Sequence, residues 1–86
     1  NPFNSSSVIP FRTDLDGDVR LEIFDIMGRQ VVTVLADFLA AGSHRATWHG
    51  RDDKGRPVAS GVYVYRLQAP TVDGWTQATH KLALLR

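Results

Sequence analysis

The 86-residue sequence contains no cysteine, which excludes disulfide frameworks, thiol catalysis and cysteine-ligated zinc together. It also lacks an excess of charge of either sign, because 10 Lys and Arg residues face 9 Asp and Glu residues for a net charge of +1. A nearly balanced chain has no electrostatic basis for binding nucleic acid or an anionic membrane. No apolar run approaches the roughly 20 residues of a membrane span, and no signal-peptide pattern is present. We therefore expect neither a nucleic-acid partner nor membrane insertion.

The composition is that of an ordinary globular domain, with 43% hydrophobic and 22% charged residues. The length allows one small domain, and we predict a single domain over residues 1–86. The chain begins at Asn1 without an initiator Met. We interpret it as a piece of a larger protein, with residues 1–4 as the junction after a linker.

Seven glycines and four prolines divide the chain into segments of strand length. The clearest strand is residues 19–23, where apolar and charged side chains alternate. We predict further strands at residues 6–12, 29–35, 44–48, 58–59, 62–67 and 75–85. Pro10 indicates an edge position for the first of them, because proline cannot donate to a ladder. About seven short strands without a long helix predict an all-β fold, an antiparallel β-sandwich.

Two segments between these strands are less regular. Residues 31–39 place Val31, Val34, Leu35, Phe38 and Leu39 at the spacing of an amphipathic helix. The β-branched run at the start of the segment argues against a helix, so we predict a strand to Leu35 and a short crossover after it. Residues 70–74 contain proline and glycine, and we predict a loop there.

Several polar residues are candidates for metal binding or catalysis. Three aspartates share the 1, 3, 5 spacing of a calcium loop, namely Asp14, Asp16 and Asp18. Val19 occupies the position where such a loop needs glycine, so we expect a solvated turn instead. His44 and His49 are expected on opposite strand faces, and Ser60 lacks the nucleophile-elbow pattern. A pair of catalytic carboxylates, as in a glycoside hydrolase, remains an alternative, but a small sandwich has little room for the substrate cleft around such a pair. We expect no catalytic residue, no metal and no cofactor.

Four aromatic residues separate into two groups. Trp48, Tyr63 and Tyr65 lie within strand patterns, which favours core packing with a hydrogen-bonded polar tip. Trp75 begins a strand after a glycine turn, where an indole ring can be exposed. An exposed ring can stack on a sugar face. Trp75 is therefore a candidate carbohydrate contact, and one alternative function is a carbohydrate-binding module of a polysaccharide-degrading enzyme.

Five motifs run through the chain in order. They are Asn-Pro-Phe-Asn at residues 1–4, Asp-Ile-Met-Gly-Arg at 25–29, Trp-His-Gly-Arg-Asp at 48–52, Gly-Arg-Pro-Val-Ala-Ser-Gly-Val-Tyr-Val-Tyr at 55–65, and Lys-Leu-Ala-Leu-Leu at 81–85. This series resembles the C-terminal sorting domains of the type IX (Por) secretion system. It is equally similar to the related immunoglobulin-like domain of flagellar hook-capping proteins.

The resemblance implies an immunoglobulin-like β-sandwich at the C-terminus of a larger secreted protein. A secretion machinery would recognise the domain and carry the upstream cargo domain from the periplasm across the outer membrane to the cell surface, where a surface peptidase would remove the domain. The resemblance places recognition on Lys81, Leu82, Leu84 and Leu85. The remaining alternative is a structural immunoglobulin-like domain of a hook-cap-type assembly.

Overall fold

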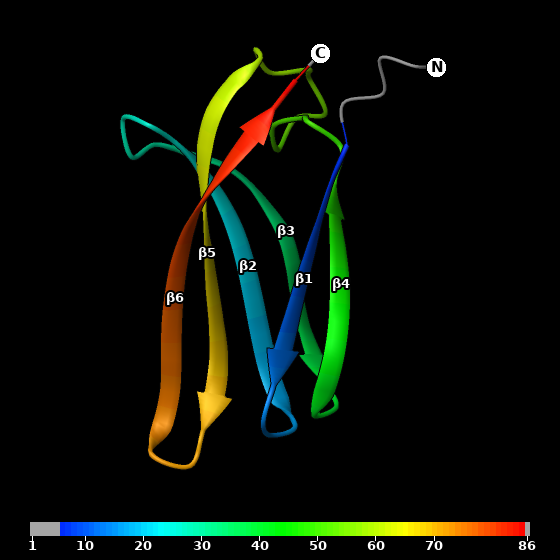
Figure 1. Cartoon of the computed structure of the whole chain (residues 1–86), viewed down its shortest axis with the longest axis vertical. Helices are drawn as coiled ribbons and strands as arrows, with labels where there is room; N and C mark the ends of the chain where they lie inside the picture. The colour runs from blue at the N-terminus through cyan, green and yellow to red at the C-terminus, as the bar shows by residue number, and fades with distance from the viewer. Residues whose placement is uncertain (1–5, 86) are drawn as a thin grey trace.

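The computed structural model describes residues 6–85 and forms an all-β, immunoglobulin-like sandwich, as predicted (Figure 1). Its six strands are β1 (Ser7–Thr13), β2 (Gly17–Asp25), β3 (Gln30–Leu39), β4 (Gly42–Trp48), β5 (Gly61–Thr71) and β6 (Gly74–Leu84). Every strand pair is antiparallel. Within the described residues, no helix has the length and apolar character needed to cross a membrane. The junction predicted at residues 1–4 lies outside the described part of the chain.

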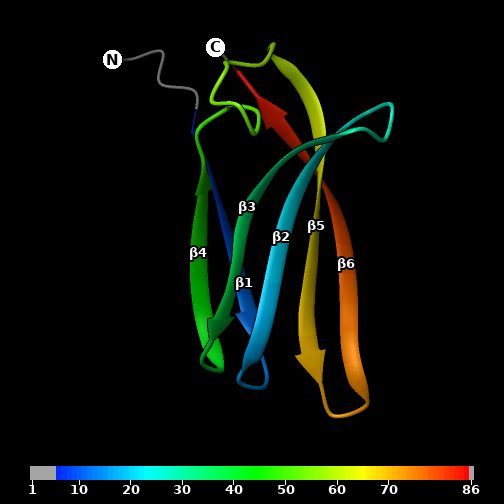
Figure 2. The ribbon, with the colours of Figure 1, turned by 180° about the vertical axis from the view of Figure 1, so that it is seen from behind.

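The strands form two sheets that enclose one core. One sheet has the order β3-β2-β5-β6, and the other pairs β1 with β4. The β1 strand lies in front of β3 in Figure 1 and behind it in Figure 2, so the sheets form two layers. Both layers contribute to the buried cluster, which comprises Ile9, Leu21, Ile23, Ala46, Trp48, Tyr63 and Leu84. The core therefore lies between the sheets.

The β2 strand confirms the clearest sequence prediction. Val19, Leu21 and Ile23 are almost fully buried, as their alternation with charged residues predicts. Gly28 has φ of 84° in the turn after β2, a conformation that favours glycine. Pro10 lies in β1, which pairs with β4 alone among the described strands and is an edge strand as predicted.

The β3 strand is longer than predicted. It continues to Leu39, and no crossover interrupts it, because Asp18 and Gly17 of β2 pair with Phe38 and Leu39. The β2–β3 register shifts between Leu21 and Glu22 and again between Ile23 and Phe24. Such bulges break the two-residue alternation along a strand pair. The apolar spacing that resembles a helix therefore belongs to a bulged strand.

Two other predictions are wrong. Residues 58–59 form no strand, and only an isolated bridge between Arg51 and Pro57 marks this loop, so the sandwich has six strands rather than about seven. The predicted loop at residues 70–74 is a tight hairpin, since β5 continues through Pro70 to Thr71. The β2–β5 register ends at Gln68, so Pro70 needs no donor toward β2.

Candidate functional site

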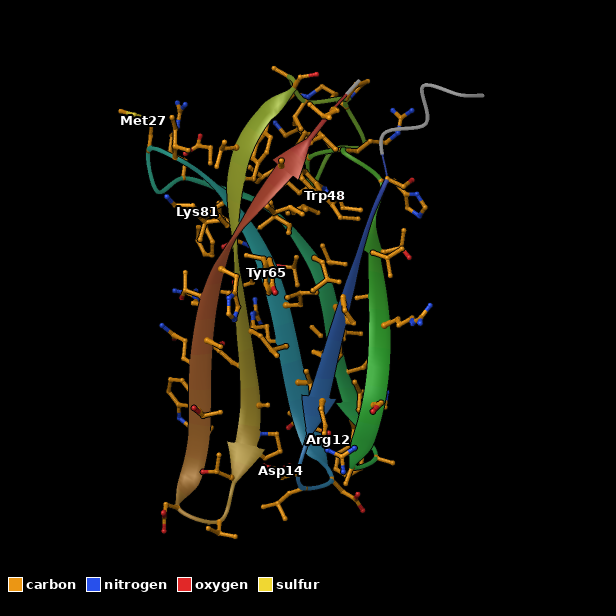
Figure 3. The ribbon with its side chains drawn as sticks, viewed as in Figure 1. Arg12, Asp14, Met27, Trp48, Tyr65 and Lys81 are labelled. Carbon is orange, nitrogen blue, oxygen red and sulfur yellow. The ribbon has the colours of Figure 1, made fainter. Side chains whose placement is uncertain are left out.

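The four residues predicted for secretion-signal recognition divide between the core and the surface. Leu84 is 1% exposed, and Leu82 packs against the core while half-buried. Lys81 is exposed and points away from the side of β6 on which Trp48 lies (Figure 3). Leu85, just after β6, is 80% exposed. A partner can therefore contact Lys81 and Leu85, whereas Leu82 and Leu84 hold the strand in the sandwich.

The β6 strand is an edge of the four-stranded sheet. It pairs with β5 over its whole length, from Gly74 opposite Thr71 to Leu84 opposite Gly61. Within the described part of the chain it has no second neighbour. An edge strand presents backbone N–H and C=O groups that another strand can pair with. The exposed side chains and the ladder groups of β6 thus form one continuous surface, here called the β6 edge.

A network of charges crosses the outer face of the same sheet, the face turned away from the core. Glu22 of β2 is 4% exposed and accepts a hydrogen bond of 2.8 Å from Arg66 of β5. Its other carboxylate oxygen lies 3.3 Å from Arg20 Nε. The Arg66 guanidinium also lies 4.7 Å above the centre of the Phe24 ring, which favours its position through a cation–π contact.

Burial alone would raise the pKa of Glu22. Hydrogen bonds and charge from Arg66 and Arg20 outweigh burial and lower the pKa below its ordinary value. The alternation of β2 predicts Glu22 on the face opposite the core, but not that its side chain is buried. Arg66 lies 44 residues further along the chain, so only the strand register brings the pair together.

Two turns share the pattern Asp-x-x-Gly-Arg, at residues 25–29 and 52–56. In the first turn, Asp25 Oδ1 accepts hydrogen bonds from the backbone N–H groups of Met27 and Arg29, and Oδ2 accepts one from Arg29 Nε. The second turn repeats these three bonds between Asp52 and its own residues at the same offsets. The repeat is visible in the sequence and is a signal that sequence reasoning missed.

These bonds change the chemistry of both aspartates. Backbone hydrogen bonds to the carboxylate, chiefly from the N–H of Arg29 and of Arg56, lower the pKa of Asp25 and of Asp52 respectively. The second turn is also tied to the start of β3, because the N–H of Asp53 donates to the carbonyl of Val31 at 3.0 Å. Met27 lies at the outer tip of the first turn (Figure 3). The acids therefore act as fixed turn-forming acceptors.

The aromatic residues divide largely as predicted, except that Tyr65 is only half-buried against the core and its hydroxyl makes no hydrogen bond with another residue in the range 6–85. Trp48 and Tyr63 are buried, with ring centres 5.0 Å apart in an edge-to-face arrangement. Their polar tips are bonded, since Trp48 Nε1 donates to Arg51 O and the Tyr63 hydroxyl donates to Ala59 O at 2.6 Å. Trp75 is 64% exposed. Its orientation leaves it free to meet a ligand, although carbohydrate contact stays a prediction.

The residues weighed for metal binding lie apart or have other partners. Among residues 6–85, no three His, Asp or Glu side chains are grouped to hold a metal ion. Asp16 Oδ1 accepts a hydrogen bond from the Ala41 N–H at 2.7 Å, which ties two turns together. His44 bonds with the carbonyl of Ala40, and His49 with the hydroxyl of Ser6.

The chain matches one protein-family model and several solved structures. Residues 5–73 match the family model described as the FlgD Ig-like domain. No curated protein sequence matches the chain. The matched range ends before β6 and so does not include the β6 edge.

Solved structures with the same fold come from two kinds of protein. FlgD from Xanthomonas campestris, described with insights into the hook capping essential for flagellar assembly, is 28% identical with a TM-score of 0.71, over 94% of this chain and 56% of that one. FlgD from P. aeruginosa is 23% identical with a TM-score of 0.70, over 92% and 59%. Dimeric latent PorU from Porphyromonas gingivalis is 24% identical with a TM-score of 0.74, over 99% and 8%. The chain thus spans less than two thirds of each of these proteins.

Proposed function

Because the chain belongs to the FlgD Ig-like domain family, we propose that it is a non-catalytic recognition domain, a C-terminal sorting module for a larger secreted protein. The module directs its upstream cargo domain from the periplasm across the outer membrane to the cell surface. Its partners are the secretion machinery and a surface peptidase that removes it on export. The observation that carries this proposal is the β6 edge, where an unpaired strand edge meets the exposed Lys81 and Leu85.

Strand addition is the physical basis of recognition. A receptor strand that pairs with β6 gains main-chain hydrogen bonds along the ladder. These bonds provide affinity whatever side chains the two strands carry. Specificity then comes from the side chains that the strand leaves exposed. Lys81 supplies a positive charge and Leu85 an apolar contact, while Leu84 keeps the end of the strand anchored.

The extent of the similarities supports a module within a longer chain. The PorU alignment covers nearly all of this chain but a small part of PorU, so a domain of this kind occurs inside a much larger protein. That alignment also reaches over the β6 edge, which the family match omits.

A structural role in a hook-cap-type assembly is the second candidate. The identity of 28% to Xanthomonas campestris FlgD over 94% of the chain favours it. The preceding region of the gene discriminates between the two candidates. A catalytic domain upstream of Asn1 supports sorting, whereas a short flagellar assembly region supports the hook cap.

The sorting proposal is tested on the full-length protein in its own bacterium with the double variant Lys81→Glu and Leu85→Asp. Both side chains are exposed, so folding is preserved and recognition alone changes. We expect the cargo to accumulate in the periplasm, measured by cell fractionation. Deleting residues 81–86 is a weaker test, because the deletion also removes the buried Leu84 and unfolds the domain.

A matched control carries Met27→Asp and Arg45→Glu, two exposed positions outside β6 with the same change of charge. This variant is expected to reach the surface normally. Normal surface delivery of the Lys81 and Leu85 variant would refute recognition through the β6 edge.

A further inference from the structure

The outer face of the four-stranded sheet carries a shallow hollow near the β5–β6 hairpin. Its volume is about 600 Å³, within the range of small-molecule sites. The residues that line it come from four strands and include Asp18, Arg20, Ala36, Asp37, Gln68, Pro70 and Trp75. The hairpin lies at the opposite end of β6 from the C-terminus (Figure 1). The hollow is thus separate from the exposed end of the β6 edge.

Strand register explains why these side chains meet. Trp75 lies nine positions before the buried Leu84 in an unbroken ladder, so its side chain is on the outer face. Trp75 pairs with Pro70, and Gln68 pairs with Arg20 on the neighbouring strand. On the other side of Arg20, its partner in β3 is Ala36, whose small side chain leaves room for the hollow.

The polar groups beside the ring are held in place before any ligand arrives. Gln68 Nε2 donates to Gln77 Oε1 at 3.1 Å, which leaves the Gln68 carbonyl and the Gln77 amide N–H groups to bond elsewhere. Arg20 Nε is held 3.3 Å from Glu22, which Arg66 fixes in turn. The remaining N–H groups of Arg20 are available as hydrogen-bond donors to a ligand.

The ionisable side chains that line the hollow are two acids, Asp18 and Asp37, and one base, Arg20. The Asp18 carboxylate makes no hydrogen bond or ion pair with another residue in the range 6–85, and it adds acceptor capacity to the site. Arg20 already shares its charge with Glu22. An anionic ligand would meet the Asp18 and Asp37 carboxylates, and a cationic ligand would meet the Arg20 guanidinium. The site therefore suits an uncharged ligand rich in hydroxyl groups, with an apolar face for the exposed indole.

We propose that this hollow binds a neutral carbohydrate. The C–H face of a pyranose ring stacks on Trp75, which is 64% exposed. The hydroxyl edge accepts hydrogen bonds from Arg20 and donates to the Asp18 carboxylate and the side-chain carbonyl of Gln68. The hollow is separate from the Lys81 and Leu85 contacts of the sorting proposal, since Trp75 precedes Lys81 by six residues, about 20 Å along an extended strand.

The test is affinity electrophoresis of the 86-residue chain through gels containing hydroxyethyl cellulose, xyloglucan, mannan or laminarin, with alginate as the anionic comparison. We expect retardation by at least one neutral polysaccharide, unchanged in 0.5 M NaCl, because the contacts are not ionic. The variant Trp75→Ala is expected to weaken binding about 5- to 150-fold, as loss of an aromatic stacking platform does for nucleobases.

The matched control is Phe38→Ala, which removes an aromatic ring that is 70% exposed but does not line the hollow. This variant is expected to bind like the parent chain. Absence of retardation by all four neutral polysaccharides overturns the proposal. Binding that survives Trp75→Ala, or binding to alginate alone that salt abolishes, also overturns it. Export of the full-length Trp75→Ala protein stays normal, so failure here is distinct from failure of the sorting proposal.

Discussion

Replacing Leu84 with alanine is expected to lower the free energy of unfolding by about 2–5 kcal/mol. The side chain is 1% exposed and belongs to the buried cluster that both sheets share, so truncation removes apolar burial and leaves a cavity. A domain of 86 residues has a total stability of roughly 4–13 kcal/mol. The substitution therefore removes a large fraction of the stability. A loss of about 3 kcal/mol lowers the melting temperature by about 12–24 °C.

Leu85 is the matched control for this experiment, because it is the next residue and is 80% exposed. Leu85→Ala is expected to change stability by no more than about 0.5 kcal/mol. Urea denaturation followed by tryptophan fluorescence measures both variants under the same conditions. Equal losses at Leu84 and Leu85 would refute the division of this segment into a buried anchor and an exposed contact.

Three further predictions concern close approach, a buried hydroxyl and acid stability. A Cβ atom at Gly17 would lie 2.7 Å from Pro70 Cγ, so Gly17→Ala is expected to cost about 1–3 kcal/mol in urea denaturation, and an unchanged midpoint contradicts the close approach. Tyr63→Phe removes the donor to the Ala59 carbonyl and is expected to cost about 0.5–1.5 kcal/mol by calorimetry, whereas a more stable variant would argue against that bond. The folded state lowers the pKa of Glu22, so its contribution to stability is present above its unfolded pKa and disappears as pH falls through the folded value. Urea midpoints measured from pH 7 to about pH 3 are expected to fall less steeply in Glu22→Gln, and parallel curves contradict this.

Local patterns in the sequence predict much of the fold because each depends on nearby residues. The alternation in residues 19–23 identifies the central strand, and Gly28 marks the turn after it. The strand positions of Trp48 and Tyr63 predict buried rings with bonded tips, which the structure confirms. These predictions need no knowledge of which strand pairs with which.

Most of the features that sequence reasoning missed depend on how one strand pairs with another. Because the β2–β3 ladder contains bulges, the apolar residues at 31–39 do not alternate as in a regular strand and instead have the spacing of a helix. The burial of Glu22 follows from the β2–β5 register that places Arg66 beside it. The hollow beside Trp75 likewise combines four strands whose order in the sheet no local pattern reveals.

The division of the predicted recognition residues follows instead from the local geometry of one strand. Lys81, Leu82, Leu84 and Leu85 form one short motif in the sequence, yet the pleat of β6 sends Leu84 into the core and Lys81 to the outer face. Under the sorting proposal, the motif therefore combines folding and recognition in neighbouring positions. Variants at the exposed positions alone can separate the two roles.

The most direct test of the account is export of a reporter fused to the N-terminal side of this 86-residue chain. The fusion is expressed in a bacterium with an intact type IX secretion system and in a matched strain whose system is inactivated. Sorting by this domain predicts that the reporter reaches the cell surface in the first strain and stays in the periplasm in the second. A reporter that stays in the periplasm of both strains, while the domain is folded, would contradict the proposed function.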